Sequence, residues 1–248
     1  MLNHAWDVEI DQGRLASQGQ KCLHFGEPRN REWQVPDFLD DVPVMSATVL
    51  ALDMIVHEPH IDLTLVSELV LSDVGATIKT FQMIRWEYES AEDRPSRMVD
   101  CLASLDMNLW SKAISSRLFA CDREHASTTA VWKHSRLVAR YAQLVAESLI
   151  GISPEEAYLV GLLHGFEAIP PVIELQSLDG ARAIGVLLAI EEVLPSFVIS
   201  AIHGVNDSVP SSQWSFILNA AHELASSGAH SDSSICGRRR YQDIGYLC

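Results

Sequence analysis

The segment from Ser153 to Gly165 constrains the fold of this chain more than any other, because it contains a helix start, an apolar run and a stop. Ser153 can cap a helix, Pro154 suits the first helical position, and Glu156 can complete a capping box. The apolar residues that follow run to His164, and Gly165 then ends the helix. This pattern predicts a helix that belongs to the core of a helical protein.

Helical signals of the same kind recur from Val42 to about residue 225, and they predict an all-α fold. Asp62 is expected to cap a helix with Leu65, Leu69 and Val70 inward. The expected helices lie at 44–57, 63–72, after Asp73, in two pieces within 96–119, at 128–149, 154–164, after Pro170-Pro171, at 181–193, 196–203 and 211–225. The helix at 128–149 is expected to bury a stripe made of Val131, His134, Val138, Tyr141 and Val145.

The two ends of the chain differ in character from this helical region. Residues 1–35 are polar and lack helical periodicity, so we expect a short irregular N-terminal extension. Residues 36–225 form the helical domain. Residues 226–248 are rich in Ser and Gly and contain Arg238-Arg239-Arg240, which predicts a flexible tail.

Composition excludes several classes of protein. The 248 residues carry a net charge of -15, which argues against binding to nucleic acid or to an anionic membrane surface. The five cysteines include no CxxC pair, as expected in a reducing compartment. The N-terminus has no signal-peptide pattern, and no apolar run is long enough to cross a bilayer. We therefore expect a cytoplasmic protein.

Three sequence blocks stand in order along the chain: Val42-Pro43-Val44-Met45 with Leu71-Ser72-Asp73-Val74, then residues 131–139, then residues 155–164. Together with a later block they resemble the HDOD domain family of the HD superfamily. The first resembles the family's "L-P-x-x-P … s-D-P" opening, the second its "W-x-H-S-x-x-x-A" and the third its "e-e-A-f-l-a-G-L-L-H-D-I-G". A later block, Gly185-Val186-Leu187-Leu188 with Leu194-Pro195, is similar to "G-a-L-L … L-P".

The resemblance implies an HD-superfamily-like multi-helix fold and a bacterial signalling context, in which such domains usually act as regulatory or interaction modules. It also marks departures from the family pattern. Gly165 stands where HD phosphohydrolases have the aspartate of a His-Asp pair. Ala181 replaces a family histidine, and Val205-Asn206 replace a late histidine pair, with His203 two positions early.

His134, His164 and His203 are the candidate residues of a vestigial pocket. HD phosphohydrolases need histidines together with carboxylates, because carboxylates balance and bridge the metal ions. Here we expect His134 and His164 to face each other as packed core residues, with no catalytic residue, no metal and no cofactor. Glu167 is expected to be a solvated residue past the helix end rather than a substitute carboxylate.

The leading hypothesis is a non-catalytic regulatory domain that binds a protein partner in a signalling pathway, without enzymatic activity. Two alternatives stay open: a metal-dependent HD-type phosphohydrolase with an atypical site, and a sensor of a small molecule such as a nucleotide second messenger. The sequence leaves the partner, the pathway and a homo-oligomeric state undetermined.

Overall fold

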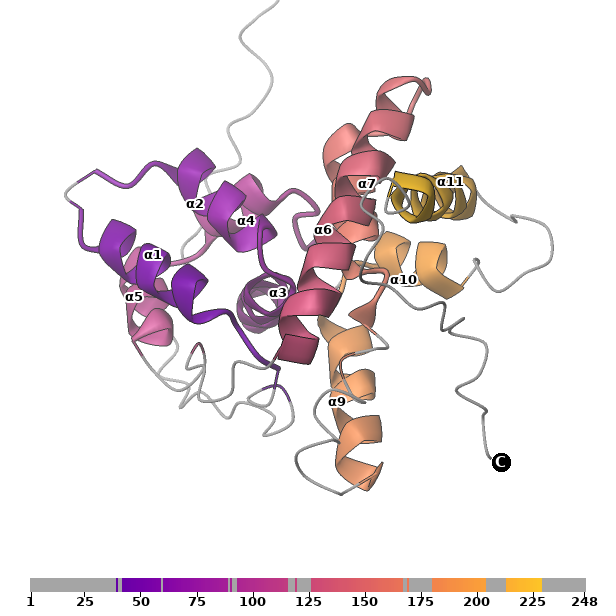
Figure 1. Cartoon of the computed structure of the whole chain (residues 1–248). Helices are drawn as coiled ribbons and strands as arrows, with labels where there is room; N and C mark the ends of the chain where they lie inside the picture. Colours follow the sequence, from indigo (N-terminus) through magenta and orange to yellow (C-terminus); the bar gives the residue numbers. More distant parts are fainter. Residues whose placement is uncertain are drawn as a thin grey trace, which may run out of the picture. The chain divides into compact units, whose positions relative to one another are not determined.

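The computed structural model describes one helical unit of the chain (Figure 1). All described residues lie within a unit that runs from Val35 to Cys248. They are residues 39, 42–58, 60–88, 90, 93–115, 119, 126–166, 169, 180–203 and 213–228. Over this part of the chain the regular structure is entirely helical, which confirms the predicted all-α class. None of its helices is long and apolar enough to cross a membrane.

The first half of the described chain contains α1 (Ser46–Val56), α2 (Leu63–Leu71), α3 (Val74–Glu87), α4 (Met98–Ser104) and α5 (Met107–Ile114). Aspartate side chains cap three of these helices. As predicted, Asp62 caps α2, by accepting hydrogen bonds from the backbone N–H groups of Thr64 and Leu65 at 2.9 and 3.4 Å. Asp106 caps α5 in the same way, and Asp73 caps α3.

The second half contains α6 (Ala126–Glu147), α7 (Pro154–Leu163), α9 (Gly180–Val193), α10 (Ser196–His203) and α11 (Gln213–Gly228). Ser153 caps α7, accepting from the backbone N–H of Glu156 at 3.4 Å, and Pro154 occupies the first turn as predicted. Instead of a reciprocal capping-box bond, the Glu156 carboxylate accepts a hydrogen bond from the Ser96 hydroxyl at 3.1 Å. It links the start of α7 to the segment before α4.

Helix α3 is buried on all sides over most of its length, because residues 74–84 are all buried. Asp73 anchors its N-terminus. Its carboxylate accepts hydrogen bonds from Met45 N at 2.7 Å, Ala76 N at 3.1 Å and Trp132 Nε1 at 2.9 Å. A single buried carboxylate thus joins the segment before α1, the start of α3 and the middle of α6.

Helices α6, α7 and α11 pack on one another, and α6 packs most extensively on α7 (Figure 1). The close approach of α6 and α7 depends on Gly161. A Cβ atom at this position would lie 2.6 Å from Ala139 Cα, which is shorter than carbon atoms tolerate. Glycine therefore lets the two helix backbones meet, and this meeting brings His134 on α6 near His164 at the end of α7.

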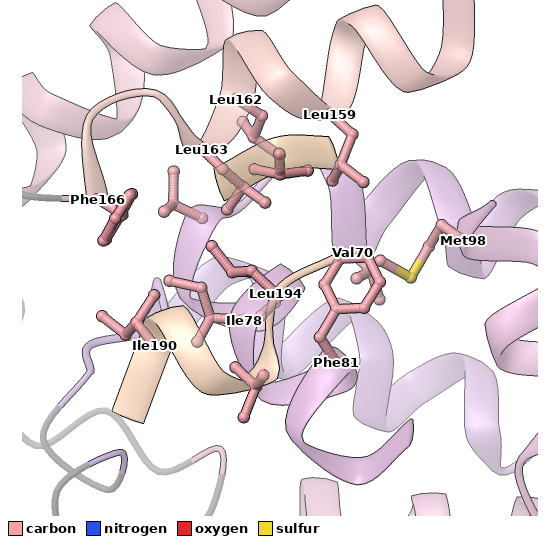
Figure 2. Close-up of a cluster of buried hydrophobic side chains, with 14 of the residues drawn as sticks. Val70, Ile78, Phe81, Met98, Leu159, Leu162, Leu163, Phe166, Ile190 and Leu194 are labelled. Carbon is pink, nitrogen blue, oxygen red and sulfur yellow. The ribbon is translucent and has the colours of Figure 1, made fainter. Parts of the chain in front are cut away.

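A continuous apolar core connects these helices with α2, α3, α4 and α9 (Figure 2). Figure 2 shows Phe81 of α3 near Val70 of α2 and Met98 of α4, with Leu159 and Leu162 of α7 and Leu194 after α9 around them. The predicted burial was wrong at Leu65, whose side chain is exposed, because α2 turns Val66, Ser67 and Val70 to the core instead.

The buried face of α6 differs from the stripe predicted for the helix at 128–149. In α6 Val138 is buried as predicted, whereas His134, Tyr141 and Val145 are only half-buried. The most buried face carries Trp132 and four small residues, Ser135, Ala139, Ala142 and Ala146. The small side chains allow close helix packing. His134 therefore lies at the edge of the buried face, where α7 and α11 meet α6.

Candidate functional site, a three-histidine cluster

Three histidines from three helices meet in one cluster. His134 lies in the middle of α6, His164 follows the last residue of α7, and His222 lies in α11. All three are half-buried. The cluster thus sits where the three mutually packed helices converge.

The Nε2 atoms of these histidines point toward one another. His134 Nε2 lies 3.3 Å from His164 Nε2 and 3.3 Å from His222 Nε2. The ligand nitrogens of all three lie within 4.8 Å of one another. The ring planes cross at 61° to 87°, so the rings meet through their edges rather than stacking. The predicted proximity of His134 and His164 is present in the structure.

A backbone hydrogen bond sets the tautomer of His164. Its Nδ1 lies 2.6 Å from the carbonyl oxygen of Gly161, and a nitrogen in this position must donate. The neutral ring then carries its hydrogen on Nδ1, so that Nε2 presents a lone pair to the cluster. This is the arrangement in which metal-ligating histidines are commonly held by their surroundings.

The surroundings favour neutral imidazoles throughout the cluster. Burial lowers the pKa of His164 from its usual 6.5 to about 3. Burial, followed by the nearby His222, lowers the pKa of His134, and burial also lowers the pKa of His222. Near neutral pH the three rings are therefore uncharged and carry lone pairs that can accept a proton or bind a cation.

No carboxylate joins the cluster within the described part of the chain, where the group able to hold a metal consists of the three histidines. Gly165 follows His164 directly, and a Cβ atom added there would lie 3.3 Å from Ser135 Oγ. Glu167 lies outside the described residues, as does the side chain of Ala181. The predicted flexible tail with Arg238-Arg239-Arg240 and the extension at 1–35 also lie outside them.

His203 lies elsewhere. It is exposed at the end of α10, with Nε2 3.5 Å from Glu191 Oε1. The third histidine of the cluster is His222, not His203. The sequence did not predict this, because His222 lies 58 residues beyond His164 and no local spacing pairs the two. The helical periodicity of α11 could have indicated His222. Leu218, Ala221 and Ala225 are buried and define the inner face of this helix, and His222 lies next to that face.

An open hollow of about 780 Å³ adjoins the cluster at His222. The described residues that line it are polar or small apart from Phe216, and they include Asn219, Glu223 and Ser226. Among the described residues of the cluster, His222 is thus the one that lines this hollow.

The model of the HDOD domain family matches residues 102–169, a stretch that contains α6, α7, His134 and His164. This match confirms the resemblance to HDOD domains that the sequence blocks indicate. The third histidine, His222, lies beyond the matched stretch. A search of curated protein sequences gives no match.

Two crystal structures of the MmoQ response regulator from Methylococcus capsulatus strain Bath share the fold. One, of a fragment covering residues 20–298, has a TM-score of 0.55 at 16% identity, over 80% of this chain and 93% of that chain. The other has a TM-score of 0.58 at 16% identity, over 79% and 90% of the two chains. At this identity the likeness establishes the helical architecture alone.

Proposed function

We propose that this chain is a non-catalytic signalling domain that acts by binding another protein. The observation that carries the proposal is the composition of the cluster: three histidine nitrogens, with Gly165 where the HD motif has its aspartate and no carboxylate from the described residues. The HDOD match and the likeness in fold to MmoQ, a response regulator, support the signalling context.

Without a carboxylate, the cluster lacks the type of ligand that holds the metal ions in HD-type hydrolysis. HD-type hydrolysis uses metal ions to activate water and to polarise a phosphoryl group, and carboxylates hold these ions. Mg²⁺ and Mn²⁺ prefer oxygen ligands, so three neutral imidazoles make a poor site for them. The scaffold of α6 and α7 is kept, while the ligand set that Mg²⁺ or Mn²⁺ would need is incomplete.

A hydrolysis assay tests this part of the proposal. The purified chain is incubated with cyclic dinucleotides and nucleotide phosphates in the presence of Mg²⁺, Mn²⁺ or Zn²⁺. We expect no turnover above the level of a His164→Ala variant. Turnover in the native protein that disappears in His164→Ala would overturn the non-catalytic assignment.

An exposed apolar pair on α1 supports a protein partner. Leu50 and Met54 lie one turn apart and are 63% and 65% exposed. Acidic residues lie nearby. Asp53 lies between the two in sequence, exposed Glu58 follows the end of α1, and exposed Glu68 lies on the neighbouring helix α2. This surface suits a partner that presents apolar side chains flanked by basic ones.

The partner surface is tested by affinity capture with paired variants. Leu50→Asp combined with Met54→Asp alters the α1 surface, and Ile150→Asp is the control, because Ile150 is 99% exposed at a turn after α6. We expect a partner captured by the native chain and by the control but not by the double variant. Equal capture by all three would place the contact elsewhere and overturn the assignment to α1.

A second candidate function is a hydrolase with a transition metal at the cluster, and the observation that favours it is the third histidine, His222. Zn²⁺ held by three histidines can activate a water molecule at its fourth position. The Zn²⁺ arm of the hydrolysis assay decides between the two candidates.

A sensor of a nucleotide is the third candidate, supported by the hollow beside His222. Thermal stabilisation by a nucleotide, absent in His222→Ala, would favour it.

A further inference from the structure

The contacts among the three histidines cannot all be hydrogen bonds. The Nε2 of neutral His164 has no hydrogen, because its Nδ1 donates to Gly161. His134 Nε2 can carry one hydrogen, which can point at His164 or at His222 but not well at both, although both lie 3.3 Å away. At least one of the two contacts therefore cannot be a good hydrogen bond between neutral rings, whereas a cation placed among the three nitrogens could bind a lone pair from each ring.

The spacing of the nitrogens matches a known coordination geometry. Zn²⁺ binds histidine nitrogens at 2.0–2.1 Å in a tetrahedron, which places two ligand nitrogens about 3.3–3.4 Å apart. The two shorter separations in the cluster are both 3.3 Å, and all three ligand nitrogens fall within 4.8 Å.

From this geometry we propose that His134, His164 and His222 form a binding site for one divalent transition metal ion of the Zn²⁺ class. Imidazole nitrogen suits Zn²⁺, Co²⁺ and Ni²⁺ rather than Mg²⁺ or Ca²⁺. The Gly161 carbonyl orients His164 from outside the coordination sphere.

The position of the site gives the ion a structural consequence. Its three ligands come from α6, from the end of α7 and from α11, so that one ion would hold together the three helices that already pack on one another. Three ligands leave the fourth position of a tetrahedral ion for water or an added anion, and the hollow that His222 lines lies next to the cluster. The proposal does not depend on the chain being non-catalytic.

The test uses the full chain without an affinity tag of histidines. The protein is stripped with a chelator and titrated with Co²⁺, whose visible absorption reports a tetrahedral nitrogen site, and with Zn²⁺ by calorimetry. The variants are His222→Ala and the matched control His203→Ala, which removes an exposed histidine outside the cluster. Circular dichroism checks that His222→Ala remains helical.

We expect one ion per chain in the native protein and in His203→Ala. Affinity should fall roughly tenfold or more in His222→Ala, since loss of even an outer hydrogen-bond partner commonly costs 10–100-fold. Zn²⁺ should raise the melting temperature of the native chain and of His203→Ala more than that of His222→Ala. Equal Zn²⁺ affinity in all three proteins, or no binding by the native chain, would overturn the site. One bound ion without turnover keeps both proposals, and one bound ion with turnover keeps the metal site alone.

Discussion

Trp132 Nε1 donates a hydrogen bond of 2.9 Å to the carboxylate of Asp73, across 59 positions of the sequence. The bond connects two of the sequence blocks that resemble the HDOD family, and it is buried. The same carboxylate accepts from Met45 N and Ala76 N. Asp73 and Trp132 thus have a structural role, because they hold the start of α3 against α6.

Asp73→Ala should destabilise the fold strongly. It leaves two buried donors, Ala76 N and Trp132 Nε1, and the part-buried Met45 N without their acceptor. Each buried donor left without a partner costs about 1–3 kcal/mol. We expect the free energy of unfolding to fall by about 3 kcal/mol or more, measured by urea denaturation. Asp62→Ala is the control, because it removes an exposed cap of α2 worth about 1 kcal/mol. Equal losses for the two variants would contradict the anchoring role of Asp73.

Gly161→Ala should also destabilise the protein, although alanine favours a helix over glycine by about 1 kcal/mol. The added Cβ would lie 2.6 Å from the backbone of Ala139, and overpacking of this kind costs about 1–3 kcal/mol. A lower melting temperature would show that the contact between α6 and α7 outweighs helix propensity. Gly165→Ala, which meets only the Ser135 hydroxyl at 3.3 Å, should cost less than Gly161→Ala. A more stable Gly161→Ala protein would disprove the close approach.

Gly165→Asp should raise the affinity for Mn²⁺ by roughly tenfold or more, because it supplies an oxygen ligand beside His164. Isothermal titration with Mn²⁺ measures the change. Gly165→Asn is the control, since it matches the aspartate in size without its charge. If both variants bind Mn²⁺ as weakly as the native chain, the missing carboxylate is not what limits binding of oxygen-preferring metals.

Cys101 should resist alkylation in the folded protein. Its thiol is buried, donates to the Pro95 carbonyl, and burial raises its pKa to about 12 from an ordinary 9.0. Below pH 9 the thiolate is then about a thousandfold scarcer than for an ordinary thiol, and the thiolate is the form that reacts. Reactivity should increase tenfold per pH unit up to the pKa and recover on unfolding. Peptide mass spectrometry after iodoacetamide treatment follows the site, and rapid labelling of the native chain at pH 8 would contradict its burial.

The sequence by itself determined the helical class and most helix positions in the described chain, because these depend on local signals. Asp62 and Ser153 cap the helices they were expected to cap, and the apolar run before His164 is the buried helix α7. The pairing of His134 with His164 followed from the two family blocks that contain them. Local rules failed at Leu65, because the burial of a side chain depends on which neighbouring helix covers it.

Only the tertiary structure decided the composition of the histidine cluster. His222 and His203 are both histidines of late helices, and nothing in their local sequence tells which one reaches His134. Packing of α11 on α6 and α7 brings His222 inward, while the end of α10 leaves His203 exposed beside Glu191. A site built from three helices is set by how they pack, and periodicity along one helix does not contain that information.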